Sequence, residues 1–201
     1  MSFIHRFEPG TSDTTLLLLH GTGGNEHDLI GLARDLSPTA KLLSPRGKVL
    51  ENGAPRFFRR LAMGVFDEAD LKAQAADLAR FVQEAAERYS FDAGRVYALG
   101  YSNGANIAAA LLLLHPEVLA GGVLLRPVLP LEPPTLPDLS GKAVFLAAGR
   151  RDPWAPSERV EALARWLEQA GANVELRWQD AGHELHPEEL EVARAWLARR
   201  V

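Results

Sequence analysis

Short apolar runs and amphipathic patterns alternate along this chain from one end to the other. Runs of strand length lie at 14–19, 40–43, 95–99, 122–125, 143–147 and 174–178. Patterns with apolar residues three and four apart, typical of helices, cover 25–36, 68–89, 103–114, 156–170 and 187–200. Strands that alternate with helices in this way predict a mainly parallel sheet covered by helices on both faces. We expect a single α/β domain over residues 1–201, with its chemistry at the carboxyl ends of the strands.

Two segments interrupt this alternation. Residues 46–67 contain several glycines around an aromatic and arginine-rich stretch, and they predict a long connection. Residues 126–141 contain five prolines and form the other candidate loop. Long loops in compact domains are often binding loops. Neither segment is long enough for an inserted domain, so we expect no large lid over the site.

Composition narrows the class of protein. Hydrophobic residues make up 47% and charged residues 24%, an ordinary globular balance, and the net charge of −4 gives no reason to expect nucleic acid as a partner. The chain has no cysteine, which excludes disulfides, thiolate metal sites and cysteine nucleophiles. Its longest apolar stretch, 107–114, is far shorter than the roughly 20 residues of a membrane span. With no signal-peptide pattern at the N-terminus, we expect a cytoplasmic protein.

The strongest chemical signal is Gly100-Tyr101-Ser102-Asn103-Gly104, which matches the pattern G-x-S-x-G. A predicted strand precedes it and a helix that is apolar almost all round follows it, which is the context of a nucleophilic serine. The glycines are needed because side chains two residues either side of the serine would collide with neighbouring backbone. A helix-capping serine is the alternative interpretation, and the strand–turn–helix context argues against it.

A serine hydroxyl becomes a nucleophile only when a base removes its proton and an acid orients that base. His183 lies between the last predicted strand and the last helix, and Asp152 follows the strand before. The order Ser102, Asp152, His183 is the one typical of α/β-hydrolases. His186 remains an alternative base and Asp180 an alternative acid.

The second half of an oxyanion hole is expected in an early strand-to-helix loop, and His20-Gly21-Thr22-Gly23-Gly24 occupies that place. A phosphate-binding loop is the competing interpretation of such a glycine cluster. It is weak, because neither G-x-x-x-x-G-K-[ST] nor the full G-x-G-x-x-G spacing is present.

Four stretches together resemble the phospholipase/carboxylesterase family of small α/β-hydrolases, which includes acyl-protein thioesterases: 20–26, 100–106, 149–153 and 182–185. The resemblance is closest to the bacterial carboxylesterase-like branch and extends over nearly the whole chain. It implies that the backbone N–H groups of Thr22 and Asn103 stabilise the oxyanion. It also implies that no metal or organic cofactor is needed, and it allows a homodimer, since many members are dimers.

Three further positions are candidates for substrate binding. Where thioesterase-like relatives carry a small Ser-Gly pair, this chain has Leu125-Arg126-Pro127, which makes thioesterase specificity doubtful. Arg126 either binds an anionic substrate group or forms a structural ion pair with a loop carboxylate. Phe57 and Phe58 either line the acyl pocket or pack in the core. The arginines beside them, at 56, 59 and 60, either attract an acidic leaving group or form a solvated cluster.

These features predict a serine carboxylesterase that hydrolyses soluble esters of short to medium acyl chain through an acyl-enzyme on Ser102. A thioesterase or lysophospholipase with the same catalytic residues is the nearer alternative. A non-catalytic binding module of the same fold is the other, although such proteins usually lose the serine, the acid or the histidine.

Overall fold

The computed structural model describes residues 3–200, which form a seven-stranded sheet in the order β1-β3-β2-β8-β9-β10-β11. Every neighbouring pair of strands is parallel except β1 and β3, which are antiparallel at the edge. The strands are β1 (His5–Glu8), β2 (Thr15–Leu19), β3 (Lys41–Pro45), β8 (Val96–Tyr101), β9 (Gly121–Leu125), β10 (Ala143–Gly149) and β11 (Asn173–Gln179).

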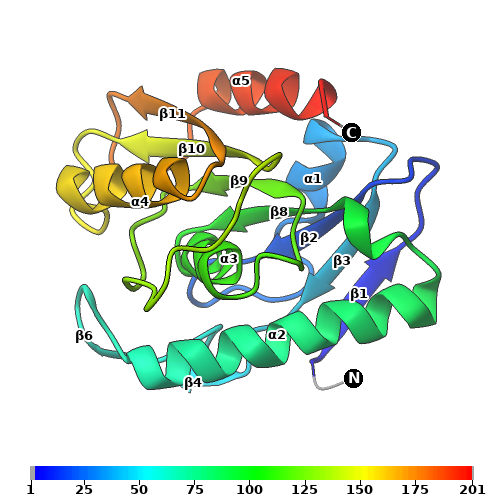
Figure 1. Ribbon diagram of the computed structural model, residues 1–201, viewed down its shortest axis with the longest axis horizontal. Coiled ribbons are helices and arrows are strands. Elements are labelled where there is room, and N and C mark those ends of the chain that lie inside the picture. Colours follow the sequence, from blue (N-terminus) through cyan, green and yellow to red (C-terminus); the bar gives the residue numbers. More distant parts are fainter. Residues whose placement is uncertain (1–2, 201) are drawn as a thin grey trace.

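Helices cover both faces of this sheet, as the sequence predicts. They are α1 (Ile30–Leu36), α2 (Glu68–Tyr89), α3 (Asn103–Leu114), α4 (Ser157–Gln169) and α5 (Pro187–Ala198), with a short 3₁₀ helix at Ala93–Arg95. Helices α1 and α5 pack on one face, and α2, α3 and α4 on the other (Figure 1). The result is a three-layer α/β-hydrolase fold with no separate cap over the described residues.

Strand β2 shows how the sequence produces these layers. Leu16 and Leu18 pack with α1 and α5, while Leu17 and Leu19 pack with the helices of the opposite face. Side chains alternate along a strand, so a continuous leucine run is stable only where both faces are covered. The same reasoning applies to α3, which lies buried between the sheet and α2 because it has no polar face.

Three local expectations need correction. The helix expected from residue 25 begins at Ile30, because Asn25 holds a turn: its side-chain Oδ1 accepts the N–H of His27 and its carbonyl oxygen accepts that of Asp28. Strand β1 was not expected. The connection at 46–67 contains two hairpins: β4 (Val49–Glu51) with β5 (Ala54–Arg56), and β6 (Arg60–Ala62) with β7 (Val65–Phe66).

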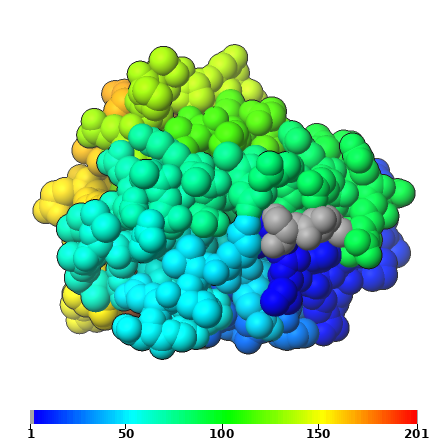
Figure 2. Space-filling view, turned by 90° about the horizontal axis from the view of Figure 1, so that it is seen from below, coloured from blue at the N-terminus to red at the C-terminus, as the bar shows by residue number. Residues whose placement is uncertain are grey.

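The hairpin segment lies beside the long helix α2, where Figure 2 shows it in cyan next to the green of the helix. Strands β5 and β6 lie at the carboxyl end of the sheet, where Arg56 and Arg60 line the same pocket as Ser102. No helix within residues 3–200 is both long and apolar enough to cross a membrane.

Candidate active site

Ser102 occupies a sharp turn between β8 and α3. Its φ of 54° and ψ of −115° are unusual for a residue with a side chain, and such conformations cost energy that the surrounding structure must supply. A Cβ at Gly104 would collide with the carbonyl oxygen of Leu19, and one at Gly100 would lie 2.7 Å from the carbonyl oxygen of Gly104. The glycines of the motif therefore permit the turn that exposes the serine hydroxyl.

The structure brings Ser102, His183 and Asp152 together in a hydrogen-bonded series. His183 Nε2 lies 2.8 Å from Ser102 Oγ, and His183 Nδ1 lies 2.7 Å from Asp152 Oδ2. Since the carboxylate can only accept, Nδ1–H donates to it and leaves Nε2 free to accept the serine hydroxyl proton. This is the arrangement in which an imidazole can act as a base.

Asp152 is suited to hold that imidazole. Its side chain is fully buried, and burial alone would raise the pKa of the carboxyl group. The hydrogen bond from His183 and the 2.9 Å bond from the Trp154 N–H outweigh burial, so the pKa lies below its ordinary value. The carboxylate thus stays ionised and fixes the ring orientation of His183.

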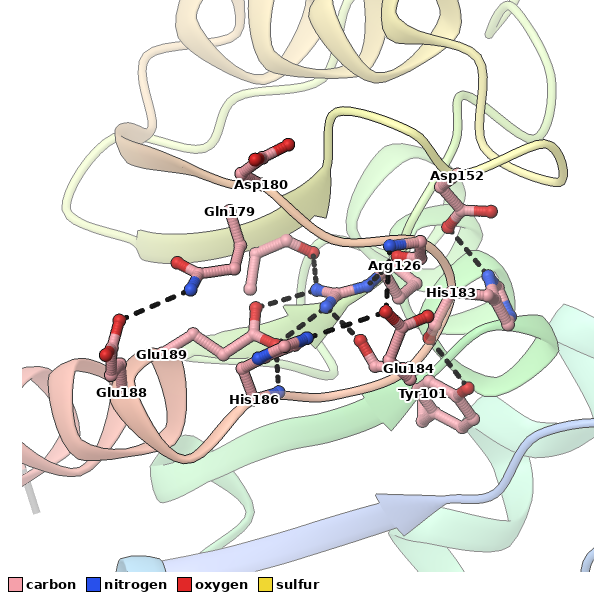
Figure 3. Close-up of polar contacts among 12 residues, drawn as sticks. Tyr101, Arg126, Asp152, Gln179, Asp180, His183, Glu184, His186, Glu188 and Glu189 are labelled. Atoms are coloured by element: carbon pink, nitrogen blue, oxygen red, sulfur yellow. Dashed lines mark hydrogen bonds and ion pairs between the residues drawn. The ribbon is translucent and has the colours of Figure 1, made fainter.

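Neither alternative residue takes part in this series. The Asp180 side chain is 77% exposed and forms an ion pair with Arg151. His186 precedes α5, and its Nε2 lies 3.5 Å from Glu184 Oε1. In Figure 3 both side chains lie apart from the contact between Asp152 and His183.

Two side chains, those of Arg126 and Tyr101, donate hydrogen bonds to three successive carbonyl groups of the loop that carries His183 (Figure 3). Arg126 donates to the carbonyl oxygens of Gly182 and Glu184, and the Tyr101 hydroxyl donates to that of His183 at 3.0 Å. Burial raises the pKa of the Tyr101 hydroxyl, which keeps it a donor. The loop is therefore fixed on both sides of the histidine.

This network corrects the substrate-binding interpretation of Arg126. The side chain is fully buried and pairs with Glu189, in the first turn of α5, rather than with a loop carboxylate. It does not line the pocket beside Ser102. The sequence was compatible with two roles for Arg126, an anion site and an ion pair, and the structure places Arg126 in an ion pair.

The loop after β2 carries Thr22, one of the two predicted oxyanion residues. His20 is buried, with Nδ1 2.7 Å from the carbonyl oxygen of Gly21 and Nε2 accepting the N–H of Gly47 at 3.0 Å. Burial lowers the pKa of His20, and the neutral ring can donate at Nδ1 and accept at Nε2 at once. It thereby joins the loop after β2 to the loop after β3, next to Thr22.

Asn103 is the first residue of α3, so its backbone N–H has no partner within the helix and lies beside Ser102. Its side chain is buried, and Oδ1 accepts the N–H of Phe57 at 2.8 Å. The side chain thus attaches the hairpin segment to α3.

Ser102 opens into a cavity of about 330 Å³. Its lining residues are Thr22, Arg56, Arg60, Met63, Gly64, Phe66, Tyr101, Ser102, Asn103, Asn106, Trp154 and His183. Phe57 and Phe58 are absent from this lining and are 1% and 0% exposed, so their interpretation as acyl-pocket residues was wrong. Phe57 packs against His20 and Phe58 against Phe66.

The apolar part of the pocket instead comes from Met63, Phe66 and Trp154, which the sequence analysis did not select. Trp154 is half exposed, two residues after Asp152. Trp154 could have been selected from the sequence, because it is an aromatic residue in a turn close to the candidate acid. Met63 and Phe66 are positioned by the second hairpin, which sequence did not predict.

The sequence model of the phospholipase/carboxylesterase family matches residues 8–200. The chain belongs to this family. The resemblance inferred from the motifs is thereby confirmed, and so is the hydrolase fold that it implied.

Relatives of this phospholipase/carboxylesterase member cover nearly its full length. A Bacillus subtilis (strain 168) protein named "Putative hydrolase MhqD" is 54% identical over 197 residues, 98% of each chain. The crystal structure of the Bacillus cereus carboxylesterase is 48% identical and covers 98% of this chain and 93% of its own, with a TM-score of 0.95. A structure of YahD with malic acid is 31% identical, covers 98% of both chains and has a TM-score of 0.93.

Within residues 3–200 of this family member, no three His, Asp or Glu side chains form a group that could hold a metal ion. Independence from metals and organic cofactors stays a prediction that follows from the family resemblance.

Proposed function

We propose that this protein is a serine carboxylesterase that hydrolyses soluble esters of short to medium acyl chain through an acyl-enzyme on Ser102. The hydrogen-bonded series of Ser102, His183 and Asp152 at the wall of a pocket is the observation that carries this proposal. Membership of the phospholipase/carboxylesterase family and similarity to a carboxylesterase structure support the ester as substrate.

The reaction begins when His183 Nε2 removes the hydroxyl proton of Ser102 and Oγ attacks the ester carbonyl carbon. The backbone N–H groups of Thr22 and Asn103 stabilise the negative charge on the carbonyl oxygen in the tetrahedral intermediate. The intermediate collapses to an acyl-enzyme as His183 returns the proton to the departing alcohol. Water, deprotonated by His183, then releases the acid and restores Ser102.

Pocket size supports small substrates. The cavity of about 330 Å³ is near the lower end of the range for small-molecule sites, roughly 300–1,000 Å³. Within residues 3–200 no inserted lid domain lies above it, and Trp154 at its wall is half exposed. A small site open to water suits soluble esters better than emulsified fats. A structural relative has been solved with malic acid, a small soluble carboxylic acid.

A thioesterase or lysophospholipase would use the same catalytic residues, and only turnover of thioesters or lysolipids against simple esters distinguishes them. The assembled Ser102–His183–Asp152 series argues against a binding module, since such proteins usually lose one of the three residues. Homodimer formation and a cytoplasmic location stay predictions.

The test is hydrolysis of p-nitrophenyl esters, from acetate to palmitate, by the wild type and Ser102→Ala. We expect turnover to favour short chains and kcat to fall on the order of 10⁶-fold in the variant, as in a comparable serine-hydrolase triad. His183→Ala should lose a similar factor. Equal turnover by wild type and Ser102→Ala would contradict the proposal, and a preference for the longest chains would contradict the assigned substrate size.

A further inference from the structure

Two guanidinium groups line the pocket that contains Ser102. Arg56 ends β5 and Arg60 begins β6, so both come from the hairpin segment. The Arg56 side chain is 4% exposed and that of Arg60 is 24% exposed. Apart from these two arginines, the described lining contains no lysine, arginine, aspartate or glutamate.

The carboxylate of Glu51 forms ion pairs with both arginines. Glu51 Oε1 lies 2.8 Å from Arg60 Nε and Nη2. Glu51 Oε2 lies 3.2 Å from Arg56 Nε but accepts no well-directed hydrogen bond, because this Nε donates to the carbonyl oxygen of Phe58. Two positive charges therefore share one negative charge at this wall of the pocket.

The partners of Arg56 leave its charge poorly compensated. Besides the Phe58 carbonyl, it donates from Nη1 to the hydroxyl of Thr22 at 2.6 Å, and both acceptors are neutral. Burial, followed by the nearby charge of Arg60, lowers the pKa of Arg56. Since a poorly compensated buried charge is costly, an anion in the pocket would stabilise this arrangement.

Arg60 has a donor available for such an anion. Its Nη1 lies 3.4 Å from the sulfur of Met63, a weak acceptor. The Met63 side chain is exposed and flexible, so a stronger acceptor can displace it.

We propose that the pocket selects esters that carry a carboxylate group, which Arg60 binds while the ester carbonyl lies at Ser102. Arg60 Nη1, which now has only the weak Met63 acceptor, would donate a charge-assisted hydrogen bond to such a carboxylate. Arg60 lines the same pocket as Ser102, and Arg56, which shares Glu51 with Arg60, donates to Thr22 in the oxyanion loop, so a single substrate can reach both the anion site and the reacting serine. This inference rests on the proposed esterase function and names its substrate class.

The test compares two pairs of nearly isosteric esters. In the first pair the carboxylate is on the acyl side: the mono-p-nitrophenyl ester of adipic acid against its terminal amide. In the second it is on the leaving group: 4-acetoxybenzoate against 4-acetoxybenzamide. Uncatalysed hydrolysis is measured with Ser102→Ala and subtracted. We expect kcat/KM to be about 10- to 100-fold higher for the carboxylate in at least one pair, as for a charge-assisted hydrogen bond.

Arg60→Gln should reduce this ratio to about one, and Arg60→Lys should retain part of it because a point charge remains. Arg59→Gln is the matched control: its side chain is 63% exposed, pairs with Asp67 and does not line the pocket. The ratio should persist in this control.

Three outcomes would overturn the inference. Equal turnover of carboxylate and amide in both pairs would refute the anion site while leaving the esterase function intact. A carboxylate preference that survives Arg60→Gln would refute the role of Arg60. Turnover of none of the four esters above the Ser102→Ala background would contradict the proposed function itself, and the inference with it.

Discussion

The guanidinium group of Arg126 forms a bidentate ion pair with the carboxylate of Glu189, with both contacts at 2.7 Å and both side chains buried. Arg126 adopts a left-handed conformation, with φ of 57°, at the end of β9. Glu189 also accepts the N–H of His186 at 2.7 Å. The pair therefore joins the sheet to the start of α5 and fixes the loop between them, which carries His183.

Replacing Arg126 with methionine should lower the free energy of unfolding by about 3–5 kcal/mol, because Glu189 would remain as a buried charge without its partner. Arg177→Met is the matched control, since Arg177 pairs with Glu175 at 60% side-chain exposure. Exposed pairs contribute at most about 1 kcal/mol. Urea unfolding of both variants measures the difference. Equal losses would mean that the buried pair contributes no more than a surface pair.

The same pair shows why some site residues could be predicted from sequence and others could not. Ser102, Asp152 and His183 each follow a strand of a parallel sheet, so their meeting at one edge follows from topology. The environment of Arg126 depends on Glu189, 63 residues further along the chain, and no local pattern indicates that contact. The choice between the two interpretations of Phe57 and Phe58 could not be made from sequence for a similar reason, because their burial requires hairpins that the sequence did not predict.

Prediction of the secondary structure succeeded where the local signals were strong. Helix α2 has the predicted bounds because Asp67 caps its N-terminus through the N–H of Asp70, and Ser90, at φ of 54°, ends it. Helix α3 also has the predicted bounds, between Ser102 and His115. The strands of the hairpin segment have only two or three residues each, too few to show an alternation of period two.

Asn103→Ala should reduce the stability of the protein more than its rate of ester hydrolysis. The variant keeps the backbone N–H proposed as an oxyanion donor but leaves the buried N–H of Phe57 without its acceptor, at a cost of about 1–3 kcal/mol. Asn173→Ala, at an exposed position, serves as the control. Urea unfolding and ester hydrolysis are measured on the same samples. A loss of kcat as large as that of Ser102→Ala would instead place the Asn103 side chain in the reaction.

Acid should remove the contribution of Glu26 to stability. Hydrogen bonds from Arg46, at 2.6 and 2.7 Å, lower the pKa of Glu26 from 4.5 to about 2. On acidification the unfolded chain binds the proton first, so this contribution is complete above pH 4.5 and is lost as the pH falls from 4.5 towards 2. The free energies of unfolding of wild type and Glu26→Gln should differ clearly above pH 4.5 and converge as the pH falls towards 2.

Urea unfolding at several pH values measures this convergence, and Arg46→Gln should show the same behaviour because it removes the other partner. A difference between wild type and Glu26→Gln that is as large at pH 3 as at pH 7 would contradict the assignment.

Two glycine-to-alanine substitutions should have opposite effects. A Cβ at Gly104 would collide with the carbonyl oxygen of Leu19, so Gly104→Ala should force α3 away from β2 and displace Ser102. We expect a large loss of both stability and ester hydrolysis. Gly31 lies in α1, where an added Cβ would meet no atom within 4 Å, so Gly31→Ala should stabilise the protein by up to about 1 kcal/mol through the higher helix propensity of alanine. Thermal unfolding and kcat of the two variants test this contrast. Normal activity in Gly104→Ala would mean that the turn around Ser102 tolerates a side chain at position 104, and the steric account of the G-x-S-x-G motif in this chain would be wrong.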